Sequence, residues 1–314
     1  MASRPELGVS FLVRWAIQAT IAGALAALLV HLFGVTLSYV VTHPVAHTVH
    51  PLAGAAGAAI VAGLFLYRLA PGAAGEGIPA YLDAIRDRDG TFPLRDTIVK
   101  FPAALITLAF WGSGGLVGPL GRVVSGLSQT ITCGLQRLFP RFFADHELHS
   151  DHYHAPTTAA ISGMAAAVAA IFHAPVAGAV FAVEIIQSDQ LRYHQLFPAI
   201  LSSAATVLFM DYMGWPAPVT AVVTAHAPQT FAVVPILLVG LFSGLIGRFY
   251  TGLYRTMAVR VGRYRRQRST LRLLAGMLIA ASFSLLVHPA IAGTSASLMR
   301  LVSFGDIDAL GSKA

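Results

Sequence analysis

The chain has 314 residues, of which 56% are hydrophobic and only 11% are charged. Because an ordinary soluble domain carries about 25% charged residues, this composition excludes a water-soluble globular protein. The formal net charge of +7 does not indicate a nucleic-acid partner, since arginines gather in one connection, residues 248–272, as in the cytoplasmic loop of a membrane protein.

Long uncharged runs dominate the sequence. No Asp, Glu, Lys or Arg occurs in residues 15–67, 101–121, 152–183, 212–247 and 273–299. Each run is at least as long as the roughly 20 apolar residues that an α-helix needs to cross a bilayer. The runs lack the period-2 alternation of membrane β-barrel strands. The sequence therefore predicts an all-α, polytopic membrane protein whose first helix is retained rather than removed as a signal peptide.

In chain order, the apolar segments predict helices joined by short polar connections. The first is expected at residues 9–39, with the amino terminus in the cytoplasm, and the second at 52–69. Basic residues between 68 and 100 return the chain to the cytoplasmic side. Further helices are expected to follow Lys100, to run to Leu138, to flank Pro175, and to cover residues 195–213, 233–257 and 271–287. The uncharged segment 215–230 is expected to be external.

Glycine and proline interrupt the apolar pattern at three places, residues 75–79, 112–119 and 173–175. Such glycines can simply permit close helix packing, as we expect for Gly240 and Gly244. Alternatively, half-helices begin inside the membrane at these breaks, which is tolerated where the backbone is buried in protein or lines a watery cavity. The N-terminus of a half-helix favours an anion, so the three breaks in one chain favour a pore or a transporter.

These interruptions resemble motifs of the CLC family of voltage-gated chloride channels and chloride/proton antiporters. Residues 75–79, Gly-Glu-Gly-Ile-Pro, are similar to the family's Gly-Ser-Gly-Ile-Pro, and residues 115–119, Gly-Leu-Val-Gly-Pro, stand where Gly-Arg-Glu-Gly-Pro is expected. Residues 172–178, followed by Glu184, are similar to a third motif. The resemblance covers about residues 11–308 and implies a CLC-like bundle of tilted and broken helices.

The resemblance also implies a function. It predicts chloride transport by a homodimer in a bacterial-type plasma membrane, with no cofactor and no enzymatic activity. Main-chain N–H groups are expected to contribute to the anion path. The residues expected along it are Gly75, Glu76, Gly77, Ile78, Pro79, Gly115, Leu116, Val117, Gly118 and Pro119.

The sequence departs from the family at the acids that couple protons. The resemblance assigns the gating glutamate to position 117 and the proton-relaying glutamate to position 185, and this chain has Val117 and Ile185 there. Neither side chain can titrate, so passive anion movement is expected. The alternatives are an antiporter that uses another acid and a non-conducting membrane scaffold or partner subunit.

Glu76 replaces the serine that the resemblance expects to donate its hydroxyl to the anion. A carboxylate there repels chloride at short range. Three accounts remain open: a solvated first-turn acid stabilised by the helix dipole, a displaced gate that is neutral when anions pass, or a site that no longer holds chloride.

The resemblance implies that full-length relatives continue with several more helices. Residues 1–314 are therefore expected to form a single CLC-like transmembrane domain that lacks the family's C-terminal helices. The chain is then a fragment, one half of a split protein, or a degenerate relative, and composition does not distinguish these possibilities.

A histidine-rich segment follows the fourth predicted helix. Its candidate metal ligands, His146, His149, His152 and His154, lack the i, i+4 spacing of a zinc-protease helix. The favoured interpretation is a solvated connection, with metal binding or pH sensing as the alternative. The single cysteine, Cys133, excludes an intramolecular disulfide and a cysteine-based metal cluster.

Overall fold

The computed structural model describes residues 9–43, 49–140, 155–186, 193–219, 233–262 and 269–294, and within these ranges its regular structure is helical, with no strand. This confirms the all-α prediction. The α-helices are α1 (Val9–Thr42), α3 (Pro51–Leu64), α4 (Gly77–Asp87), α5 (Leu94–Ala109), α6 (Val117–Leu138), α8 (Ala155–Phe172), α9 (Pro175–Glu184), α10 (Tyr193–Met213), α11 (Val233–Gly262) and α12 (Ser269–Val287). The histidines at 146, 149, 152 and 154 lie outside the described residues.

Six of these helices are long and apolar enough to cross a membrane: α1, α3 with its π-helical extension Phe65–Leu69, α8, α10, α11 and α12. In contrast, α4 has 11 residues and α9 has 10. At a rise of 1.5 Å per residue they are about 15–17 Å long, roughly half of the hydrocarbon thickness. Short helices thus follow the breaks at residues 75–79 and 173–175, as the interrupted pattern predicts. After the break at 112–119, however, α6 has 22 residues and is not a half-helix.

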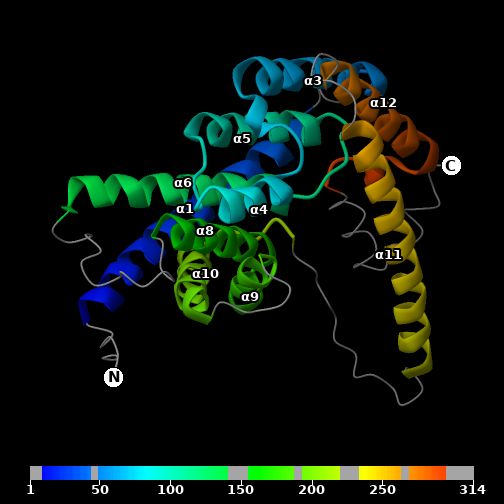
Figure 1. Cartoon of the computed structure of the whole chain (residues 1–314). Helices are drawn as coiled ribbons and strands as arrows, with labels where there is room; N and C mark the ends of the chain where they lie inside the picture. The colour runs from blue at the N-terminus through cyan, green and yellow to red at the C-terminus, as the bar shows by residue number, and fades with distance from the viewer. Residues whose placement is uncertain are drawn as a thin grey trace.

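The alanine-rich helix α8 lies at the centre of the main bundle (Figure 1), packed by α1, α6, α9 and α10. Its residues are almost entirely buried. Small side chains allow the neighbouring backbones to approach: a Cβ on Gly163 would lie 2.8 Å from the Val124 carbonyl oxygen, and one on Gly178 would lie 2.7 Å from that of Ala165. Close backbone approach at small residues is typical of membrane helices.

A second layer is formed by α3 and α12, which lie together above α5 (Figure 1). Their contact is made by small and flexible side chains, including Ala55, Ala59, Met277 and Ala281. After α12, Gly293 pairs with the glycine-rich loop before α6: its N–H donates to the Gly112 carbonyl at 2.8 Å and its carbonyl accepts from Gly114 N–H at 3.1 Å. The two layers are therefore connected at this loop.

The helix α11 stands to one side of the others (Figure 1), and every side chain described on it is exposed. A Cβ on Gly240 or Gly244 would meet nothing within 4 Å. The expected packing of this glycine pair is thus not formed within the described ranges, because no described helix lies alongside it.

Candidate functional site

Two of the three interrupted motifs meet in space. The first leads into α4 at Gly77 and the second into α6 at Val117. A Cβ on Gly77 would overlap the carbonyl oxygen of Gly118, and a Cβ on Gly118 would lie 3.3 Å from the Gly77 nitrogen and 3.7 Å from the Ile78 nitrogen. A side chain at position 77 would block this approach and one at position 118 would crowd it, so the first turns of α4 and α6 are in direct backbone contact.

Local sequence explains why both helices start there. Gly75 has φ +81°, a left-handed conformation that glycine adopts without strain, and it directs the chain into α4. Pro79 and Pro119 are the third residues of their helices, where the missing N–H is not needed. Neither helix has a side-chain cap. Two sets of first-turn N–H groups and two positive helix ends are therefore adjacent, an arrangement that favours an anion.

The residues just before Gly118 are apolar and packed. Val117 is partly buried and contacts two core clusters, one built around α4 and α9 and the other around α1, α5 and α10. Leu116 is 8% exposed. No charged group thus stands at the start of α6.

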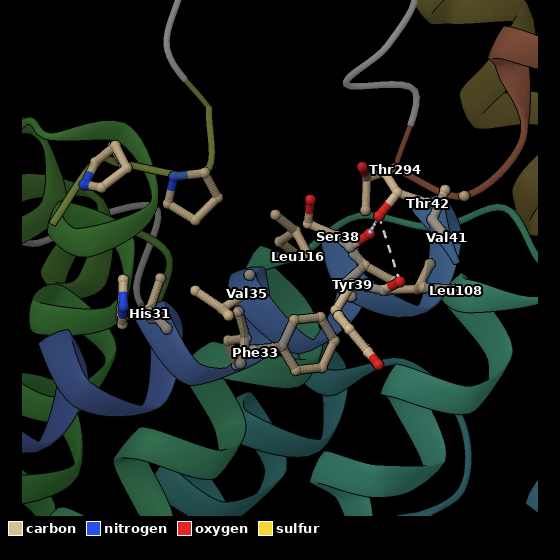
Figure 2. A pocket seen from close by; sticks show the side chains of 18 of the residues that line it. His31, Phe33, Val35, Ser38, Tyr39, Val41, Thr42, Leu108, Leu116 and Thr294 are labelled. Carbon is tan, nitrogen blue, oxygen red and sulfur yellow. Dashed lines mark hydrogen bonds between the residues drawn. The ribbon is translucent and has the colours of Figure 1, made fainter. Parts of the chain in front are cut away.

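The side chain of Leu116 also lines a cavity of about 680 Å³ between α1 and the start of α6. Figure 2 shows the α1 side chains from His31 to Thr42 along it, with Leu108 and Thr294 at its far end. The His31 ring stacks on that of Trp215, with centroids 4.2 Å apart. The Thr42 hydroxyl donates to the Ser38 carbonyl at 2.8 Å, and the wall from α1 is largely apolar. This cavity adjoins the α6 end but adds no charged ligand to it.

Glu76, the residue before α4, is exposed and accepts a hydrogen bond from the Tyr254 hydroxyl of α11 at 3.0 Å. Its carboxylate does not cap the first turn of α4. The acid at this position is thus turned outward and held by a residue 178 positions away.

Two buried cations hold the segment before α4. Lys100 of α5 donates from Nζ to the carbonyl oxygens of Ala73 at 3.2 Å and Gly75 at 2.5 Å. Arg122 of α6 donates from Nη2 to the Gly72 carbonyl at 2.6 Å. Burial, together with the charge of Arg122, lowers the pKa of the Lys100 amine to about 8, and Glu76 partly offsets this effect. Lys100 therefore lies outside the six helices that are long and apolar enough to cross a membrane, since α5 is not one of them.

Sequence reasoning did not single out these two cations. Lys100 marks the end of a charged segment and Arg122 follows an uncharged one, and nothing in the local pattern separates them from solvated charges. A general rule could have found them, because buried charged side chains in proteins are paired or hydrogen-bonded. The rule can be applied only once the structure shows which charges are buried.

The third motif takes a different position. The C-terminal end of α9, rather than its N-terminus, contacts α4: the Tyr81 hydroxyl donates to the Ala182 carbonyl at 3.4 Å and Arg86 donates to the Ile186 carbonyl. At the N-terminal end, His173 has φ +54° and lies 3.1 Å from the Asp211 carboxylate. Ile185 is partly buried against the α4 cluster, and Glu184 is exposed.

Comparisons with known proteins place the chain in a family. The profile described as "Voltage gated chloride channel" matches residues 56–310. Since this is well over half of the chain, the protein belongs to that family, as the motif resemblance predicts.

The relatives are longer than this chain. The H(+)/Cl(−) exchange transporter ClcA of Vibrio cholerae is 29% identical over 251 residues, which are 77% of this chain and 50% of the relative. The chain thus spans about half the length of this curated relative. The crystal structure of a CLC-type fluoride/proton antiporter has a TM-score of 0.73 at 21% identity, covering 96% of this chain and 72% of that one. A slow cyanobacterial Cl−/H+ antiporter has a TM-score of 0.66 at 17% identity, covering 87% and 64%. These likenesses show the fold.

Proposed function

We propose that this protein moves small inorganic anions, chloride first, passively across a membrane. The observation that carries the proposal is the backbone contact between Gly77 and Gly118, which sets two uncapped helix N-termini side by side. N–H groups at a helix N-terminus bind anions without a dedicated cationic side chain. Family membership supports the choice of chloride. Residues 75–79 and 115–119 then line one side of the path.

Passive movement is proposed because the two positions that the resemblance gives to proton-carrying glutamates hold Val117 and Ile185, and both pack into apolar clusters. A group that cannot titrate carries no proton.

The second candidate function is chloride/proton exchange through another acid. It is favoured by the similarity to the Vibrio cholerae relative, an H(+)/Cl(−) exchange transporter. Among the described residues, Glu76 is the acid nearest the helix junction, and it is exposed.

The assembly is part of the same proposal. We propose a homodimer with the amino terminus in the cytoplasm of a bacterial-type plasma membrane. The non-conducting alternative, a scaffold or partner subunit, is supported by the exposed side chains described on α11.

Chloride efflux from liposomes containing the purified protein tests the proposal. Efflux is started with valinomycin under a chloride gradient and followed with a chloride electrode. We expect efflux clearly above that of protein-free liposomes. Folded protein that gives no efflux would favour the scaffold instead.

Glu76→Gln tests the role of the outward acid. We expect chloride efflux at neutral pH to rise about twofold to fivefold, because an exposed charge near a helix end is worth about 0.3–1 kcal/mol. Efflux is measured from pH 5 to 8, with Asp83→Asn, an exchange of another α4 acid away from the first turn, as the control. An efflux and a pH profile identical to the wild type would exclude Glu76 as an influence on the path.

A further inference from the structure

Arg122 is buried without partners for two of its donor nitrogens. Its side chain is 4% exposed. Nη2 donates to the Gly72 carbonyl at 2.6 Å, whereas Nε and Nη1 find no acceptor among the described residues. A buried charged group with unfilled donors is costly, so a missing acceptor is expected beside the guanidinium.

The position of Arg122 directs it toward the helix junction. It follows Gly118 by four residues on α6, so the two share one face of the helix. Cβ atoms in a helix tilt toward its N-terminus, which brings the Arg122 side chain back along the face that contacts Gly77. Its bond to Gly72, five residues before α4 begins, agrees with this direction.

The electrostatics around Arg122 favour an anion. Lys100 is the second buried cation, 6% exposed, and it lies within electrostatic range of Arg122. The acids nearby are Asp96, which packs against the Gly72 backbone, and Glu76, which is turned outward. Within the described ranges neither acid forms an ion pair with Arg122 or Lys100 at 4 Å or less. The two cations therefore face the junction without a directly bonded counter-charge.

We propose that Arg122 and Lys100 form a binding site for a small monovalent inorganic anion, next to the first turn of α4 and on the side of residues 72–75. The Arg122 guanidinium donates to the anion through its two unfilled nitrogens, and Lys100 supplies charge. This inference rests on the proposed function, because the bound anion is the transported one. It also explains how an acid at position 76 is tolerated beside an anion path. The buried charges of Lys100 and Arg122 offset the exposed carboxylate of Glu76, although Asp96 offsets part of the Arg122 charge.

The test measures binding separately from transport. Full-length protein in detergent is titrated with sodium chloride by calorimetry, and its thermal unfolding is followed in chloride and in gluconate at equal ionic strength. A ligand that binds only the folded state raises the melting temperature. We expect chloride to stabilise the wild type relative to gluconate, and Arg122→Gln to weaken chloride affinity at least tenfold and to remove most of that difference. A purely structural arginine would change the melting temperature equally in both salts.

Arg122→Lys keeps the charge and the aliphatic part of the side chain, and it replaces Arg122→Gln in the test if the glutamine variant does not fold. It is expected to weaken chloride binding at least threefold, because the guanidinium geometry is lost. The matched control is Arg137→Gln, which changes an exposed arginine in the last turn of the same helix. This variant should bind chloride as the wild type does.

Two results would overturn the site. One is that the folded Arg122 variants bind chloride as well as the wild type does, and the other is that chloride does not specifically stabilise the wild type. Binding without efflux would overturn transport alone, and efflux with unchanged binding in the Arg122 variants would overturn the site alone.

Discussion

Replacing Gly77 with alanine is expected to reduce chloride efflux by more than tenfold. The new methyl group would overlap the Gly118 carbonyl oxygen, and a backbone atom cannot turn away as a side chain would. Relief requires α4 and α6 to separate, which moves the first-turn N–H groups out of their common position. Overpacking of this kind costs about 1–3 kcal/mol, so a lower melting temperature is expected alongside the lost efflux.

Gly134→Ala is the matched control for this experiment. Gly134 is exposed near the C-terminal end of α6, away from the junction with α4, and a Cβ there would meet nothing within 4 Å. Its efflux should stay close to that of the wild type, and its melting temperature should not fall. If Gly77→Ala carried chloride as well as Gly134→Ala does, the junction of α4 and α6 would not be part of the anion path.

Introducing glutamate at Val117 is expected to suppress chloride efflux at neutral pH by about tenfold or more. Val117 is the first residue of α6, where the positive helix end stabilises an ionised carboxylate. That carboxylate would compete with chloride for the same first-turn groups. Because a free glutamate has a pKa of about 4.3, and the helix end favours the ionised form, the block is expected to weaken only as the pH falls toward 4.

The comparison for this variant is Val117→Gln, which has a nearly identical shape and no charge. Efflux from both is measured at pH 7.5 and at pH 3.5. The account predicts a large difference between the two variants at pH 7.5 that shrinks at pH 3.5. Equal efflux from glutamate and glutamine at both pH values would place the anion path away from the start of α6.

Much of the fold can be predicted from the lengths of the apolar segments and from the positions of glycine and proline. The predicted helices at 9–39, 52–69, 195–213, 233–257 and 271–287 are all present, with ends that shift by a few residues. They are readable because bilayer thickness sets a minimum apolar length. The starts of α4 and α6 are readable too, because glycine followed by proline marks a first helical turn.

What the sequence does not reveal are contacts between distant segments. The three breaks look alike in the sequence, yet only those at Gly77 and Gly118 meet, while the third presents the C-terminal end of α9 to α4. Local pattern carries no information on which end of a short helix faces its neighbour. The bonds of Lys100 and Arg122 to residues 72–75 were unpredictable for the same reason, since they join positions 25 to 50 residues apart.

The isolation of α11 also differs from expectation. Its glycines suggest a helix contact, and among the described residues nothing lies within 4 Å of a Cβ on Gly240 or Gly244, although Tyr254 farther along α11 bonds to Glu76. The sequence pattern is typical of a packing surface, but a pattern does not specify which partner covers it.

Proton movement driven by a chloride gradient tests the central claim most directly. Liposomes containing the wild-type protein are prepared with a chloride gradient and no pH gradient, and the internal pH is followed with a trapped dye. The passive account predicts chloride efflux with no change in internal pH beyond that of protein-free liposomes. Proton movement opposite to the chloride flow, which would create a pH gradient where none existed, would contradict it and would establish exchange through an acid other than those missing at Val117 and Ile185.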